Sequence, residues 1–387
     1  MAAKSTSPDE LPLTTEAPVE PGEEKLEDLL ALCLSGGGYR AMLFHLGTLW
    51  YLAQAGYLPK LDRVSSVSGG SITAGYLALK WKDLTFDAAG VATNFESVIV
   101  APIRKLADTT IDAGGVIKGA LTPGVSINDK IIGSYKKILF GEATLQDIVD
   151  KPRFVINATN VQTGSLFRFS KPYIADYKIG MMDKPKTSLA AAVAASSAFP
   201  PVLSPARLDF KHTDWTKLAK GECAQPPYTT KVVLSDGGVY DNMGIETAWK
   251  RCKRVFVSDA GGKYQPEKNP HSDWARHALR INATIDSQVR NLRKRQVVSA
   301  FTDPKSDHTG AYWGMWTVPS EYPTSALKID DARALELAQT PTRLAKMAAE
   351  TQEAIINFGF GMAERAIRSW YDKAAFAPSK YPYKSGV

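Results

Sequence analysis

The chain has 387 residues, is 44% hydrophobic and 22% charged, and carries a formal net charge of +7. These values are typical of a soluble globular protein with one large domain or two ordinary ones. No apolar run approaches the roughly 20 residues of a membrane-spanning helix, so we expect any membrane contact to be peripheral.

The net charge and the cysteine content limit the partners and the compartment that the chain can have. The surplus of basic residues favours an anionic partner such as a phospholipid membrane surface. The sequence has no zinc-ligand spacing and no basic motif interleaved with aromatic residues, so we expect no DNA or RNA partner and no metal or other cofactor. The three cysteines are odd in number and far apart, which indicates a reducing compartment, and we expect a cytoplasmic protein. The oligomeric state stays open.

Composition also divides the chain. Residues 1–27 are rich in Pro and Glu, contain few apolar side chains and lack a signal-peptide pattern, so we expect a disordered N-terminal lead. Residues 28–375 are predicted to form one folded domain that includes the C-terminal helices. Residues 376–387 are predicted to be a tail.

A strand–helix–strand unit opens the predicted domain. Residues 29–34 (LLALCL) predict a buried strand that ends at the SGGG run of residues 35–38. An apolar-periodic helix follows and ends at Gly56, and residues 63–67 predict the next strand. Both strands therefore end at the carboxyl edge of a sheet, where open α/β sheets bind ligands.

Strand-like and helix-like segments follow in turn along the rest of the chain. Further strands are predicted over residues 153–160, 166–169, 231–234, 254–257 and 311–318. Helices are predicted over residues 94–106, 127–139, 188–196 and 275–298, and the chain is expected to finish in helices, one of them starting near Thr340-Pro341.

Two of these segments allow more than one interpretation. The helix 275–298 has Ile281, Ile285 and Leu292 at helical spacing on one side and basic residues on the other. We interpret the basic side as a solvated face; the alternatives are binding to anionic lipid headgroups and, around residues 290–295, docking of an activating nucleotide or protein. The Gly-jointed loop 109–123 either forms a lid or packs on its own domain.

Ser68 stands in a strand–turn–helix segment that would expose its hydroxyl at the end of a sheet. Such a turn requires tiny residues two positions before and two positions after the serine, and Ser66 and Gly70 meet that demand. Ser66 and Ser71 themselves each lack one such neighbour. Ser68 is therefore the candidate nucleophile, and the alternative is an ordinary serine in a Gly-rich turn.

The SGGG run of residues 35–38 is suited to stabilising an oxyanion. Consecutive glycines leave backbone N–H groups free to converge, and the start of the following helix adds a partial positive charge. A phosphate-binding loop is the alternative, but Ala41 stands where the last glycine of a nucleotide-binding motif would fall. Arg40 could hold a phosphate or pair with a carboxylate.

The base that accepts the serine proton can be a histidine or a carboxylate. None of the five histidines has a supporting local pattern. Asp236 follows a predicted strand and precedes two glycines, and partial desolvation would raise its pKa toward neutrality. Asp259, which also precedes a short glycine-containing turn, is the competing candidate.

Four short motifs occur in order: SGGGYR at residues 35–40, SVSGG at 66–70, SSAFPP at 196–201 and DGG at 236–238. This set resembles the patatin-like phospholipases over residues 32 to about 259, with Ser66 where the family's nucleophile motif has glycine. The run from Gly36 to Met42 is also similar to the glycine loop of the group-IV cytosolic phospholipases.

The resemblance implies a three-layer α/β/α fold with a mainly parallel central sheet and a Ser-Asp dyad without a catalytic histidine. By motif position, Ser68 would be the nucleophile and Asp236 the base. The group-IV likeness implies that Arg40 approaches the substrate phosphate. The implied oxyanion donors are Gly36, Gly37 and Gly38.

We therefore expect a lipid acyl hydrolase of phospholipase A or lysophospholipase type that cleaves fatty-acyl esters of membrane phospholipids through an acyl-enzyme. It would be cytoplasmic and peripherally membrane-associated. One alternative is a carboxylesterase that acts on small esters with a Ser-His-Asp triad, using His271, His277 or His308. Another is a catalytically idle scaffold that binds lipid or nucleotide.

Overall fold

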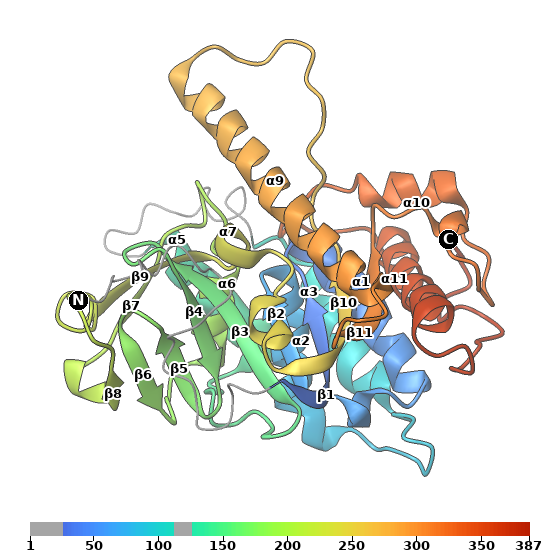
Figure 1. Cartoon of the computed structure of the whole chain (residues 1–387), viewed down its shortest axis with the longest axis horizontal. Helices are drawn as coiled ribbons and strands as arrows, with labels where there is room; N and C mark the ends of the chain where they lie inside the picture. Colours follow the sequence, from blue (N-terminus) through green and yellow to red (C-terminus); the bar gives the residue numbers. More distant parts are fainter. Residues whose placement is uncertain (1–25, 112–125) are drawn as a thin grey trace.

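The computed structural model describes residues 26–111 and 126–387 (Figure 1). Nearly all of the predicted N-terminal lead and most of the predicted loop 109–123 lie outside the described residues. The first strand, β1, already begins at Glu27.

A parallel core forms the centre of the sheet, in the order β11-β10-β1-β2-β3. The predicted strands 63–67 and 153–160 are confirmed residue for residue, and the others within a few residues at their ends. The predicted strand 311–318 is shorter, because the chain turns after Gly314. The bounds are β1 (Glu27–Leu34), β2 (Arg63–Val67), β3 (Arg153–Asn160), β10 (Cys252–Asp259) and β11 (Thr309–Gly314).

The sheet continues beyond β3 with antiparallel strands, which the sequence did not predict as a group. They follow in the order β4-β5-β6-β8, while β7 pairs with β9 and β9 pairs with β3. Short connections join β3 to β4, β4 to β5 and β5 to β6, and such connections permit antiparallel pairing of consecutive strands. The bounds are β4 (Ser165–Ser170), β5 (Tyr173–Asp176), β6 (Gly180–Asp183), β7 (Ala206–Asp209), β8 (Lys217–Leu218) and β9 (Lys231–Asp236).

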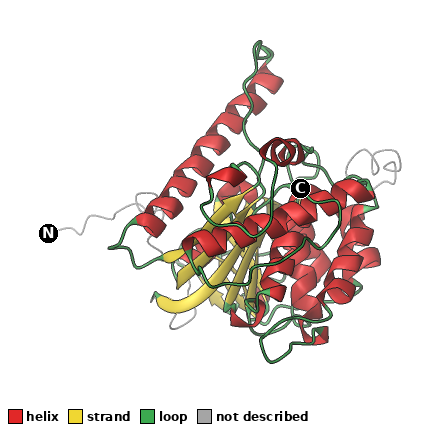
Figure 2. Cartoon of the chain, turned by 90° about the vertical axis from the view of Figure 1, so that its right-hand side faces the viewer, coloured by secondary structure: helices red, strands yellow, loops and turns green. Residues whose placement is uncertain are grey.

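Helices lie on both faces of the parallel core (Figure 2). Successive residues of β1 point to opposite faces: Leu32 joins the large core that contains α1, α2 and α11, whereas Cys33 joins a second core with α8 and Val297 of α9. Because these strands are buried on both faces, their sequences read as continuous apolar runs. The expected three-layer α/β/α fold with a parallel central sheet is therefore confirmed in its core.

The helices predicted over residues 94–106, 127–139, 188–196 and 275–298 are present, with the first two divided. Residues 94–106 form a π-helical turn (Glu96–Val100) followed by α3, and residues 127–139 form α5 followed by a second π-helical turn (Lys136–Phe140). The bounds are α1 (Gly38–Gln54), α2 (Gly69–Lys80), α3 (Ala101–Ala107), α5 (Ile127–Tyr135), α6 (Leu189–Ser196), α7 (Gly238–Asp241), α8 (Glu246–Trp249), α9 (Trp274–Thr302), α10 (Asp331–Ala338) and α11 (Ala349–Trp370).

The prediction that a helix starts near Thr340-Pro341 was wrong. The chain leaves α10 at Ala338 and does not become helical again until Ala349. The backbone carbonyls of this segment bind elsewhere instead: Thr340 O accepts a hydrogen bond from Arg40, and Arg343 O accepts one from the Tyr39 amide. These contacts hold residues 340–343 in a non-helical path between α10 and α11.

The last residues of the chain pack against α11. Asn357 Nδ2 donates to Tyr383 O at 2.9 Å, and Tyr383 N donates back to Asn357 Oδ1 at 3.1 Å. Val387 O accepts from Asp330 N at 3.2 Å. Residues 376–387 are thus bound to the body of the protein, and their separation from the domain as a tail stays a prediction.

Helices α1 and α11 touch through their backbones, and this contact yields a test of the core. A Cβ atom at Gly47 would overlap the Ile356 carbonyl oxygen, whereas a Cβ at Gly133 of α5 would meet nothing within 4 Å. We expect Gly47→Ala to lower the free energy of unfolding by roughly 1–3 kcal/mol, because α11 must move away. Gly133→Ala should leave it unchanged or raise it by up to about 1 kcal/mol. Denaturant unfolding measures both, and equal effects would contradict the packing.

Candidate active site

The turn between β2 and α2 holds Ser68 in a strained conformation. Its backbone has φ of 51° and ψ of −120°, a region that residues other than glycine rarely occupy. The turn is also crowded, since a Cβ at Gly70 would lie 2.6 Å from the Leu34 carbonyl oxygen. The sharp strand-to-helix turn required for an exposed nucleophile is therefore present at the predicted serine.

The end of α6 holds this turn in place. Ser196 Oγ accepts a hydrogen bond from the Ser68 amide at 2.9 Å and donates to Asn157 O at 2.7 Å. Ser66 and Ser71, the two serines judged less suitable as nucleophiles, are hydrogen-bonded to each other. Ser71 Oγ donates to Ser66 Oγ at 3.0 Å, and both serines are fully buried. Ser68 is the serine of this turn that keeps some exposure, 7%. The role of Ser196 was missed by the sequence reasoning, although it opens the SSAFPP motif.

Asp236 reaches the turn from a strand that runs in the opposite direction to β2. Strand β9 runs antiparallel to β3, with Asp236 opposite Ala158, while β2 runs parallel to β3, with Val67 opposite Asn157. The two strands therefore lie in line and meet carboxyl end to carboxyl end. This arrangement brings Ser68 and Asp236 together.

The Asp236 carboxylate is buried and only partly bonded. Its Oδ1 accepts the Gly238 amide at 2.7 Å, and its Oδ2 makes no hydrogen bond of normal geometry. Burial raises its pKa from the ordinary 3.8 to about 7, against the opposing effects of the Gly238 amide and the Ser68 hydroxyl. A carboxylate with this pKa can accept a proton near neutral pH.

The competing carboxylate, Asp259, has the opposite environment. Its Oδ1 accepts the Gly261 amide at 2.9 Å, and its Oδ2 accepts the Tyr312 hydroxyl at 2.8 Å. Burial alone would raise its pKa, but Arg290 and these hydrogen bonds outweigh burial and hold the pKa below the ordinary value. With both oxygens occupied, Asp259 is a structural anion.

The glycine loop lies directly against the serine, because a Cβ at Gly36 would be 3.1 Å from Ser68 Cβ. The Gly36 amide already donates to Asn242 O at 3.0 Å. In the described part of the chain, no acceptor takes the amides of Gly37 and Gly38. Gly38 has φ of 61° and opens α1, so its amide is a free donor at a helix N-terminus. Two of the three predicted donors thus remain available.

Arg40 lies behind the loop with its guanidinium buried. Its Nη1 donates to Ala338 O at 2.9 Å and Thr340 O at 2.8 Å, and its Nη2 donates to Ala260 O at 3.0 Å. Burial lowers its pKa to about 10. These contacts tie the C-terminal segment to the loop after β10, and the phosphate role of Arg40 stays a prediction.

The histidines named for a triad are bonded elsewhere. His308 stacks on Trp249 at 3.9 Å between ring centroids, and His277 Nδ1 lies 3.2 Å from His271 O at the beginning of α9. No hydrogen bond of these three histidines joins Ser68 or Asp236 among residues 26–111 and 126–387. The geometry therefore favours the dyad over the triad.

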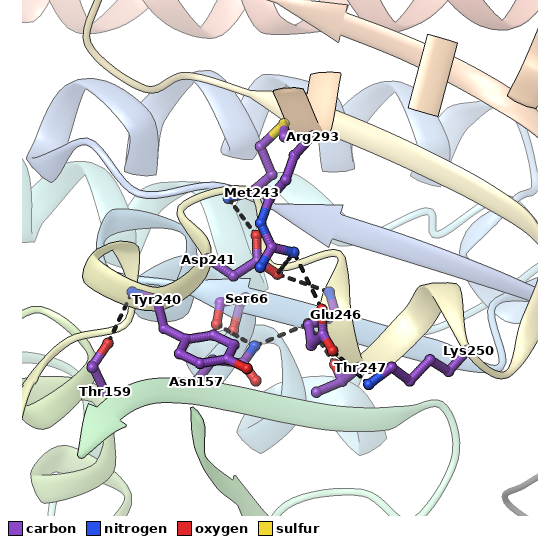
Figure 3. Close-up of polar contacts among 11 residues, drawn as sticks. Ser66, Asn157, Thr159, Tyr240, Asp241, Met243, Glu246, Thr247, Lys250 and Arg293 are labelled. Atoms are coloured by element: carbon purple, nitrogen blue, oxygen red, sulfur yellow. Dashed lines mark hydrogen bonds and ion pairs between the residues drawn. The ribbon is translucent and has the colours of Figure 1, made fainter. Parts of the chain in front are cut away.

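A buried polar cluster supports the turn that follows Asp236 (Figure 3). Thr159 Oγ1 donates to Asp236 O at 2.8 Å and accepts the Tyr240 amide at 3.1 Å. Arg293 of α9 lies 3.2 Å from Glu246 and 3.9 Å from Asp241. Helix α9 is thereby bound to the segment that follows the candidate base. Because Arg293 is paired within the protein, its charge is not free to bind an activating nucleotide or protein. No local pattern in the sequence pointed to Thr159.

Within the described ranges, no three His, Cys, Asp or Glu side chains converge on a position that could hold a metal ion. No helix among them is both long and apolar enough to cross a bilayer.

A family model matches more than half of the chain. The family model described as patatin-like phospholipase matches residues 32–249. No curated protein sequence matches the chain.

The fold is also similar to solved structures. Human GIVD cytosolic phospholipase A2, in complex with methyl gamma-linolenyl fluorophosphonate inhibitor and terbium chloride, aligns with a TM-score of 0.51 and 11% identity, covering 91% of this chain and 58% of that one. VipD from Legionella pneumophila aligns with a TM-score of 0.38 and 16% identity, covering 89% of this chain and 67% of that one. The chain thus spans about three fifths of the length of the human enzyme.

The two carboxylates yield opposite predictions for stability. The raised pKa of Asp236 means that the folded protein keeps a proton that the unfolded chain releases, so stability falls as pH rises from about 3.8 to about 7. We expect Asp236→Asn to be more stable than the wild type at about pH 8, by an amount on the order of a kcal/mol or more, and equally stable near pH 4.

Asp259→Asn is the matched control. Because its pKa is lowered, Asp259 contributes stability that is present above its ordinary pKa and lost as pH falls. The variant should therefore be less stable than the wild type at about pH 8. Thermal unfolding at both pH values distinguishes the two, and destabilisation by Asp236→Asn at pH 8 would refute the assignment of a costly buried charge.

Proposed function

The chain belongs to the patatin-like phospholipase family, and on that premise we propose that it cleaves fatty-acyl esters of phospholipids with Ser68 as nucleophile and Asp236 as base. Family membership supports lipid acyl hydrolysis in the broad sense. The observation that carries the dyad is the strained backbone of Ser68, at φ of 51°, in the turn that the buried Asp236 reaches along the edge of β3 that β2 and β9 share.

In the proposed acylation, Asp236 accepts the hydroxyl proton of Ser68 while Oγ attacks the ester carbonyl carbon. The carbonyl oxygen becomes an oxyanion, and the amides of Gly37 and Gly38, which have no acceptor among the described residues, would donate to it. The ester C–O bond then breaks, and the leaving alkoxide of the lysophospholipid takes the proton from Asp236. An acyl-serine remains.

Deacylation repeats these steps with water. Asp236 accepts a proton from water, the hydroxide attacks the acyl carbonyl, and the fatty acid leaves as Ser68 Oγ regains the proton. The N-terminus of α2 begins directly after Ser68, so its partial positive charge lies beside both tetrahedral intermediates. The proposal needs no histidine.

Replacing either dyad residue tests the proposal. We expect Ser68→Ala and Asp236→Asn each to lower fatty-acid release from phospholipid vesicles by at least about a thousandfold, because each removes a group that acts in the transition state. His271→Ala and His277→Ala should keep wild-type release. Release that survives Ser68→Ala would reject the nucleophile, and loss in a histidine variant would favour the triad. No release by the wild type would favour the idle scaffold.

The pH profile tests the base separately. Asp236 accepts a proton only when it is ionised, and its pKa is raised to about 7. We expect kcat/KM for a soluble ester to rise with pH and to reach half its plateau near pH 7. Stopped assays across the acid and neutral range measure the profile. A plateau already reached near pH 5 would exclude Asp236 as the base.

A further inference from the structure

Helix α9 extends beyond the rest of the molecule (Figures 1 and 2). Near its carboxyl end, Phe301 lies beside Gly310 at the beginning of β11, and further up Arg290 Nη2 donates to Gly262 O, just after the end of β10. Residues 274–289 therefore project past the carboxyl edge of the parallel core. At 1.5 Å of rise per residue, this segment of the helix is about 24 Å long. Ser68 lies at this same edge.

The projecting half of α9 has its polar side turned inward. The Arg280 guanidinium lies 4.0 Å from the Tyr264 ring centroid, and Arg280 Nη2 donates to Gln265 O at 2.8 Å. Thr284 Oγ1 donates to the Tyr264 hydroxyl at 3.1 Å. The protein's own loop between β10 and α9 thus covers the side of the helix that would ordinarily face water.

The apolar side faces out. On the basic side, Arg276 and Arg295 are exposed, as expected for a solvated face, whereas Arg280, Arg290, Arg293 and Lys294 are partly buried, so that interpretation holds only in part. Trp274 is 86% exposed, Ile285 is 56% exposed and Leu292 is 58% exposed, with Leu279, Ile281 and Val289 also exposed between them. A surface helix normally buries this side. A run of large exposed apolar side chains marks an interaction surface.

The charge of the same region selects the partner. Between Lys263 and Thr302 the sequence has eight Lys or Arg residues and three Asp or Glu residues. Arg290 and Arg293 bind internal partners, and Arg276 is exposed but forms an ion pair with Asp273 at 2.7 Å. Lys268 and Arg295 are exposed. A second copy of the chain would bring an equally basic helix, and the like charges would repel. An anionic bilayer offers both an apolar interior and complementary charge.

We propose that the apolar side of α9, from Trp274 to Leu292, docks on anionic phospholipid membranes. The aromatic and branched side chains enter the boundary between headgroups and acyl chains, and the exposed cations bind anionic headgroups. The inference rests on the proposed function only in taking the bilayer as the source of substrate.

Vesicle sedimentation with the full chain in a Ser68→Ala background tests docking without hydrolysis. The probe is phosphatidylcholine vesicles with and without phosphatidylglycerol. We expect binding to vesicles that contain phosphatidylglycerol, weakened by added salt. The double variant Ile281→Gln, Ile285→Gln should bind about tenfold more weakly or worse, because the inserted apolar area is lost.

A matched control removes exposed apolar side chains elsewhere. Leu335 of α10 is 51% exposed and Trp370 of α11 is 60% exposed, so Leu335→Gln with Trp370→Ser should bind like the parent. With Ser68 intact, the α9 double variant should hydrolyse a soluble short-chain ester at the parent rate. A chain that binds vesicles but hydrolyses no ester would refute the proposed function and leave docking standing.

Three results would overturn docking. The parent could fail to bind vesicles that contain phosphatidylglycerol, or the α9 variant could bind as tightly as the control. Sedimentation velocity provides the third: a parent that is dimeric, with a monomeric α9 double variant, would assign this surface to a second copy of the chain.

Discussion

The site depends on the way two strands share one edge of β3. Strand β2 pairs with residues 153–157 of β3, and β9 pairs with residues 158–160, in the opposite direction. Their carboxyl ends therefore meet. Ser68, which follows β2, and Asp236, the last residue of β9, are adjacent. The end of α6 secures the junction, because Ala198 O accepts the Asp236 amide at 2.9 Å. Any change in the register of β9 would separate the two side chains.

Two similar buried aspartates have opposite pKa shifts because their surroundings differ. Asp236 and Asp259 both end a strand and both precede small residues, so they look alike in sequence. Asp259 receives two hydrogen bonds and lies near Arg290, and it stays ionised. Asp236 is equally buried, but hydrogen bonds stabilise its charged form too weakly to offset burial, so its pKa rises. The environment of each carboxylate, and not the residue type, decides which one is suited to be a base.

Segments far apart in the chain complete the glycine loop. A Cβ at Gly38 would lie 2.7 Å from the Arg343 carbonyl oxygen, so this position must remain glycine for the C-terminal segment to approach. Arg40 binds that segment through Thr340, and Arg293 binds α9 to the turn after Asp236. The candidate machinery is therefore held by the last third of the chain, although its reactive groups lie within the residues that the family model matches.

Local pattern by itself determined much of this protein. The strands 63–67 and 153–160, the small-residue turn at Ser68 and the glycine run before α1 follow from side-chain size and hydrophobic period, which act between near neighbours. The resemblance of four ordered motifs added Asp236 and the family. The antiparallel direction of β9, the capture of Thr340 by Arg40 and the outward apolar side of α9 were decided by the tertiary structure alone. Each depends on a partner more than seventy residues away in the sequence or on a surface that the chain leaves uncovered. Hydrophobic periodicity shows that a helix has two sides, but it does not show which side the rest of the protein will bury.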